Sequence, residues 1–148
     1  ISLTEIKIPG SIREIGYKSF SGCSGLREIS IPSTVKTVGI GAFENCTELK
    51  DISLPTTLTE INYYTFSGCT SLTTLTLHSK LTAINNYAFA GCKSLTEIHC
   101  KNSNPPLIGE NTFRDVNRIG CKIFVPSKRA KKSYSTALYW NEFTIYIE

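Results

Sequence analysis

Four of the six cysteines recur at a fixed distance along the chain. They stand at positions 23, 46, 69 and 92, always 23 residues apart. Cysteine thiolates bind zinc, form disulfides or carry out redox chemistry, whereas a buried thiol behaves as a small apolar side chain with a weak S–H donor. The even spacing shows that a repeat must be explained before any sulfur chemistry is assigned.

Each cysteine belongs to a unit with the same apolar pattern. Five units begin at Leu3, Leu26, Leu49, Leu72 and Leu95. Apolar residues or a cysteine follow at +3 and +5, and the first four units add apolar residues at +9 and +12, phenylalanine at +17 and cysteine at +20. A fixed period of this length predicts a solenoid, in which each unit is one coil that buries its apolar side chains only when the next coil stacks on it.

The spacing within a unit indicates what the backbone does. Residues two apart, such as Ile29 and Ile31, point to one side of a strand, while Ser30 between them faces water. Proline at +6 in the first three units ends that strand because it offers no N–H group to a neighbour. A second short extended segment follows, and Phe and Cys close the coil on a third side. The sequence therefore predicts a β-rich, right-handed solenoid of about six coils.

Stacked coils place equivalent cysteines about 4.8 Å apart with parallel Cβ directions. A disulfide requires the two Cβ atoms to face each other at roughly 3.5 to 4.5 Å, and a zinc site requires ligands that converge from different directions. We therefore expect no metal and no cofactor, and a structural ladder of reduced thiols at Cys23, Cys46, Cys69 and Cys92. Cys100 and Cys121 lie out of register with each other, and the sequence leaves a bridge between them open.

The repeat ends after Pro126. Residues 127–140 predict a helix capped by Ser127, and residues 143–148 predict a final strand. The side chains expected to point inward from this segment are Ala130, Tyr134, Ala137, Leu138, Phe143, Ile145 and Ile147. We expect one domain over residues 1–148, with repeats over 1–126 and a C-terminal cap over 127–148. Because the first unit has no such cap and the chain starts without methionine, we expect a fragment of a longer chain.

The repeat Leu-x-x-Ile-x-Ile-Pro-x-x-Ile/Val-x-x-Ile-Gly/Asn-x-x-x-Phe-x-x-Cys resembles the BspA-like leucine-rich repeats of bacterial surface proteins. Four units from Leu3 to Ser94 match it closely, and the fifth departs through one inserted residue and Val116 in place of cysteine. The resemblance implies a leucine-rich repeat fold and a cell-surface or extracellular parent protein. It also implies adhesion and protein binding, without catalytic residues to carry over.

The sequence offers few groups for catalysis. His78 and His99 are the two histidines, and neither has a third ligand or a nucleophile at a useful spacing. Nucleotide-binding and zinc-protease motifs do not occur. We therefore expect a protein that is not an enzyme. The chain also has no run of 18 apolar residues, so we expect no membrane span in it.

Two surfaces of the solenoid are candidates for binding a protein on a host or neighbouring cell. Exposed positions at +1, +2 and +4 form rows across the first strands, and the candidate protein-binding face comprises Lys7, Arg27, Glu28, Lys50, Asp51 and His99. A candidate aromatic face comprises Tyr17, Tyr63, Tyr64 and Tyr87. Packing between coils explains these tyrosines equally well.

The positive charge gathers near the C-terminus. Residues 1–100 carry eight basic and eight acidic residues, whereas residues 101–148 carry eight and four. The basic residues include the stretch KRAKK at 128–132, together with Arg114, Arg118 and Lys122. The alternative function is therefore binding of an anionic polymer, glycan or nucleic acid, through the basic cap. Nucleic acid is the less favoured of the two, because aromatic residues interleaved with the cations are few.

Overall fold

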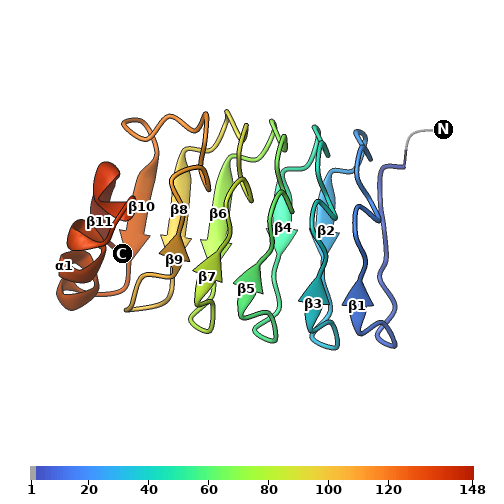
Figure 1. Cartoon of the computed structure of the whole chain (residues 1–148), viewed down its shortest axis with the longest axis horizontal. Coiled ribbons are helices and arrows are strands. Elements are labelled where there is room, and N and C mark those ends of the chain that lie inside the picture. The colour runs from blue at the N-terminus through green and yellow to red at the C-terminus, as the bar shows by residue number, and fades with distance from the viewer. Residues whose placement is uncertain (1–2) are drawn as a thin grey trace.

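The computed structural model describes residues 3–148 and shows a β-solenoid of about six coils that ends in a short helix and strand. The coils stand side by side along the long axis, with the helix at the C-terminal end (Figure 1). This is the architecture that the 23-residue period predicts. The cap predicted over residues 127–148 is present at the far end.

The first strands of the coils lie on one side of the solenoid. They are β2 (Glu28–Ser30), β4 (Asp51–Ser53), β6 (Thr74–Leu77), β8 (Glu97–Cys100) and β10 (Lys122–Val125), and the cap strand β11 (Thr144–Ile147) continues this side. All pairs are parallel, with β2 beside β4 and with the order β11-β10-β8-β6 in the larger sheet. Ile29 pairs with Ile52, and Leu75 with Ile98, so equivalent repeat positions face each other.

A second row of short strands follows on another side. It comprises β1 (Glu14–Ile15), β3 (Thr37–Val38), β5 (Glu60–Ile61), β7 (Ala83–Ile84) and β9 (Leu107–Ile108). The pairs are again parallel, and Ile61, Ile84 and Ile108 form one continuous row. The inserted residue of the fifth unit thus lies before Ile108, which still pairs with Ile84 of the coil before it.

The third side is held by a stack of phenylalanines. Phe20, Phe43, Phe66, Phe89 and Phe113 lie with ring centroids 5.3 to 5.6 Å apart and nearly parallel planes. The core between the three sides is largely apolar, and the buried cluster runs from Ile15 in the first coil to Ile145 in the cap. Ile6, Ile8 and Ile12 of the first coil are only half-buried, because among residues 3–148 no coil packs on their outer side.

The cap closes the other end of the phenylalanine stack. Helix α1 (Lys128–Thr136) begins after Ser127, whose side chain accepts a hydrogen bond from the backbone N–H of Ala130. The short 3-10 helix η1 (Trp140–Glu142) places the Trp140 ring 5.8 Å from the Phe113 ring, and Phe143 meets Phe113 edge-on at 5.7 Å. The indole N–H of Trp140 donates to the Pro106 carbonyl at 2.8 Å.

Two of the side chains predicted to point inward from the cap do not. Leu138 is 69% exposed, because α1 ends at Thr136 and the extended backbone of Ala137 takes the chain off the helical stripe. Ile147 is 45% exposed, because β11 is the last strand of its sheet. The prediction was correct for Ala130, Tyr134, Phe143 and Ile145, which are buried, and Ala137 is half-buried.

Tight turns join the sides of each coil. The turn residue at +19 adopts a positive φ in every unit, as Gly22, Asn45, Gly68, Gly91 and, after the inserted residue, Asp115. Glycine is favoured there because side chains strain this left-handed backbone. The period therefore specifies backbone conformation as well as burial.

Candidate functional site

An open groove runs across the outward face of the first strands, in the N-terminal half of the solenoid. Its volume is about 690 Å³. Glu28 and Asp51 lie directly opposite each other in the pairing of β2 with β4, and both line it. The other polar lining residues are Glu5, Lys7, Ser30, Ser53, Thr74 and Thr76. The groove thus carries rows of fixed polar side chains over a short apolar floor.

The structure separates the six residues of the candidate protein-binding face. Lys7, Glu28 and Asp51 line the groove. Arg27 and Lys50 precede the strands and are not among the lining residues, and the Arg27 Nε atom lies 3.2 Å from Glu48 Oε2. The predicted face therefore comprises two neighbouring features, the groove and its basic rim, while His99 lies on β8 in the larger sheet, further along the same side of the solenoid.

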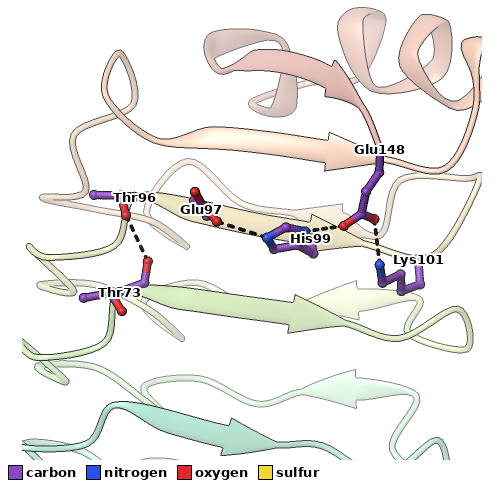
Figure 2. Close-up of polar contacts among 6 residues, drawn as sticks. All are labelled: Thr73, Thr96, Glu97, His99, Lys101 and Glu148. Carbon is purple, nitrogen blue, oxygen red and sulfur yellow. Dashed lines mark hydrogen bonds and ion pairs between the residues drawn. The ribbon is translucent and has the colours of Figure 1, made fainter.

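His99 contacts the cap, as Figure 2 shows. Its Nδ1 atom lies 2.5 Å from Glu148 Oε1, and its Nε2 atom lies 3.2 Å from Glu97 Oε2. Lys101 Nζ lies 2.6 Å from the other oxygen of Glu148. These contacts join His99 of β8, and Lys101 just after β8, to Glu148, which directly follows β11. His99 therefore ties the cap to the repeats and has both ring nitrogens engaged.

The Glu148 carboxylate is the centre of this cluster. The hydrogen bond from Lys101, and next the one from His99, lowers the pKa of Glu148 below its ordinary value. Its backbone N–H donates to the Val125 carbonyl at 2.9 Å, which fixes the position of the side chain. The ion pair between Lys101 and Glu148 thus joins the fifth coil to the end of the cap.

Sequence reasoning missed an aromatic row beside this cluster. The His99 ring stacks on Phe124 at 4.8 Å, and Phe124 lies 5.7 Å from Tyr146. The three residues are opposite each other in the pairing of β8, β10 and β11. The alternation Phe143, Ile145, Ile147 placed Tyr146 on the outer face, but the register that brings it beside Phe124 depends on the cap. The outward face of the first strands, β2, β4, β6, β8, β10 and β11, is called the strand face below. It is polar at the groove and aromatic beside the cap.

The tyrosines of the candidate aromatic face lie around one turn of the coils. Tyr64 and Tyr87 stack with centroids 4.9 Å apart and almost parallel rings, and both have positive φ angles. Tyr63 and Tyr17 are 45% and 70% exposed. Tyr17 lies two coils from Tyr63, with Ile40 at the equivalent position between them. Packing between coils accounts for the pair Tyr64 and Tyr87.

The four repeated cysteines lie in one row beside the phenylalanine stack. The Sγ atom of Cys46 is 3.3 Å from the Phe20 carbonyl, and Cys69 and Cys92 repeat the contact with Phe43 and Phe66 at 3.5 and 3.4 Å. All six cysteines are free, including Cys100 and Cys121, and only Cys23 in the first coil is half-buried. Burial raises the pKa of Cys46 and Cys92 to about 12 and raises the pKa of Cys69 further. These thiols sit where a small apolar group with one weak donor fits.

Two further properties bear on function. Within residues 3–148, no group of three or more His, Cys, Asp or Glu side chains is arranged to hold a metal ion. No helix in the same range is long and apolar enough to cross a membrane.

Comparison with solved structures gives several related solenoids. A leucine-rich cell surface protein from Faecalibacterium prausnitzii is 29% identical, with a TM-score of 0.76 over 94% of this chain and 34% of that protein. The leucine-rich repeat protein of T. pallidum is 31% identical, with a TM-score of 0.67 over 76% of this chain and 52% of that protein. This chain therefore spans about a third to a half of their length.

The pneumococcal vaccine antigen PcpA shares the fold, with a TM-score of 0.65 at 23% identity over 95% of this chain and 40% of that protein. No match was found among curated protein sequences. The model of the BspA-type leucine-rich repeat region matches residues 1–124 with six copies of the repeat. This match spans all the coils and confirms the resemblance seen in the sequence, so the chain belongs to the BspA-type leucine-rich repeat family.

Proposed function

We propose that this chain is a non-enzymatic protein-binding module that serves adhesion in a bacterial cell-surface or secreted protein. Its family is in general a non-enzymatic scaffold, and related structures include a bacterial cell surface protein. Leucine-rich repeat domains typically mediate protein interactions. The surface of this chain that suits such an interaction best is the strand face.

The groove is the observation that supports the proposal most directly. It offers about 690 Å³ of open space, and the side chains that line it are held in rows by the stacked strands. Glu28 and Asp51 are opposite each other, and no ion pair engages either carboxylate among residues 3–148. Like charges placed directly opposite in a sheet repel, and a cation docked between them relieves the repulsion. We therefore expect the ligand to present an extended segment with basic side chains.

The aromatic row at the other end of the strand face gives the ligand a second point of attachment. Tyr146 is 41% exposed and lies beside Phe124 and the His99 ring. Aromatic side chains with polar tips are enriched at protein interfaces, where they bury large areas at low cost in conformational entropy. A ligand that follows the strand face from the groove would reach this row next.

A peptide-selection experiment tests the groove. Displayed random 12-residue peptides are selected on the wild-type chain, and their affinity is then measured for Glu28→Gln/Asp51→Asn and for the rim variant Arg27→Gln/Lys50→Gln. We expect basic peptides whose affinity falls by about tenfold or more in the groove variant, because each lost charge contact costs on the order of 1 kcal/mol. The rim variant changes the same number of charges and should stay within about twofold of wild type.

Peptides that bind the groove variant as tightly as wild type would contradict the proposal. So would a gain of affinity in the rim variant as large as the loss in the groove variant, since the net charge of the chain would then account for binding. Substituting Tyr146→Ala in the same assay tests the aromatic row independently of charge, and we expect a further loss of affinity for the longer selected peptides.

A further inference from the structure

Four cations cover the exposed side of the cap helix. Lys128, Arg129, Lys131 and Lys132 are all exposed, whereas Ala130 and Tyr134 of the same helix are fully buried. With 3.6 residues per turn, the four cations occupy the arc opposite the two buried residues. The helix therefore presents a continuous basic surface to solvent, which we call the basic helix face.

No carboxylate in the described chain neutralises this face. The helix sequence KRAKKSYST contains no acidic residue, and none of its four cations forms an ion pair within residues 3–148. The acidic residues of the cap are already engaged, since Glu142 pairs with Arg118 at 2.9 Å and Glu148 pairs with Lys101. The basic helix face is thus left without an internal partner.

The placement of these cations works against the stability of the helix. Lys128 and Lys132 are four residues apart, and Lys128 and Lys131 are three apart, so like charges are neighbours on the helix surface. Lys128 and Arg129 also stand in the first turn, where the positive end of the helix dipole disfavours cations. The Ser127 cap and the burial of Ala130 and Tyr134 hold the helix in place. Charges placed against the preferences of the helix in this way are expected where the surface binds a partner.

We propose that the basic helix face binds a linear anionic polysaccharide. Such a polymer carries repeated negative groups on a chain without bases or acyl tails, so charge alone recognises it, and charge is what this face offers. A polymer that bridges several cations removes their mutual repulsion on binding. The site lies on α1 and does not include the groove, so this proposal is independent of protein binding by the strand face.

Other anionic partners fit the surface less well. Single-stranded nucleic acid is normally held by aromatic rings on which bases stack, but Tyr134, the one aromatic residue of α1, is buried in the protein. A helix that lies on a membrane inserts its apolar face into the lipid, whereas the apolar side of α1 packs against the solenoid. These two partners serve below as competing outcomes.

The test uses heparin as the probe and the whole 148-residue chain. Affinity is measured between 50 and 200 mM salt for wild type and for the variant with Lys128, Arg129, Lys131 and Lys132 all changed to Gln. With a slope of about −0.7 per neutralised charge, four contacts predict roughly a 50-fold loss of wild-type affinity over this range. We expect the fourfold variant to bind at least about tenfold more weakly at 100 mM salt and to lose most of the salt dependence.

A matched control removes the same charge elsewhere. Lys36, Lys50, Lys80 and Lys93 are exposed, make no ion pair within the described residues and all lie in the repeats. Changing these four to Gln should leave heparin affinity within about threefold of wild type. The melting temperature of the helix variant should stay equal to or rise above that of wild type, because like-charge repulsion is removed.

Several results would overturn the proposal. They are no heparin binding by the wild type at 100 mM salt, equal losses in the helix and control variants, or tighter binding to single-stranded DNA or to phosphatidylserine vesicles than to heparin. The milder variant Lys131→Gln/Lys132→Gln should have a heparin affinity between those of the wild type and the fourfold variant. If the fourfold variant folds poorly, a loss of affinity in this twofold variant tests the proposal instead.

Discussion

At the scale of single residues, burial governs the chemistry of the repeated thiols. A pKa of about 12 at Cys46 and Cys92 means that almost no thiolate is present near neutral pH, and the thiolate is the reactive form. We expect the native protein to resist alkylation at pH 7.5, and the unfolded protein without reductant to titrate all six thiols. A thiol count below four after unfolding would show that the cysteines of the row are oxidised.

Substituting one of these thiols tests the fit of sulfur to its position. In Cys46→Ser, a shorter polar side chain must reach the Phe20 carbonyl from a dry site, and we expect a loss of about 1 to 3 kcal/mol in the free energy of unfolding. Cys46→Ala should cost less, because it leaves no hydroxyl to satisfy. Cys23→Ser is the control for denaturant unfolding, since Cys23 is half-buried and should lose less than Cys46.

Glu148 makes the attachment of the cap depend on pH. Its folded-state pKa is lowered, so its stabilising effect is complete above the ordinary carboxyl pKa and is lost as pH falls through the folded value. We therefore expect Glu148→Gln to lower the melting temperature slightly at pH 7 and to have little effect near pH 3. A difference between the two proteins that grows on acidification would contradict this assignment.

At the scale of the elements, the energetic cost of the turn conformation can be measured separately from that of side-chain packing. Gly91 has a φ of +74° and an added Cβ would find ordinary van der Waals space beside Gly68, so Gly91→Ala measures backbone strain alone. We expect a loss of about 1 to 2 kcal/mol in the free energy of unfolding. Gly10→Ala, with open space and no positive φ, serves as the control and should change stability by less than about 0.5 kcal/mol.

The repeat positions could be predicted from the sequence, whereas the details of the cap could not. Residues such as Leu75 and Ile98 were predicted to face the core because a period of 23 fixes their neighbours in advance. Leu138 was misplaced because the end of α1 has no repeat to define it, and the backbone of Tyr139 turns with a φ of 66°. The contact between His99 and Glu148 joins residues 49 apart that share no period, so only the folded cap reveals it.

At the scale of the whole molecule, the cap protects the last coil. Removing residues 127–148 would uncover Phe113 and Ile123 and discard Trp140, which fills the end of the phenylalanine stack. We expect the truncated chain to aggregate or to lose cooperative unfolding, as judged by size-exclusion chromatography and thermal melts. A truncated protein that stays monomeric with an unchanged melting temperature would show that the core closes without the cap.

Because the strands share a uniform register, the length of the solenoid depends directly on its number of coils. Each coil touches only its neighbours, so a gain or loss of 23 residues leaves every remaining row of side chains in register. It also moves the cap helix by about 4.8 Å relative to the first coil. The distance between the groove and the basic helix face is thus set in discrete steps by the length of the gene, without redesign of either surface.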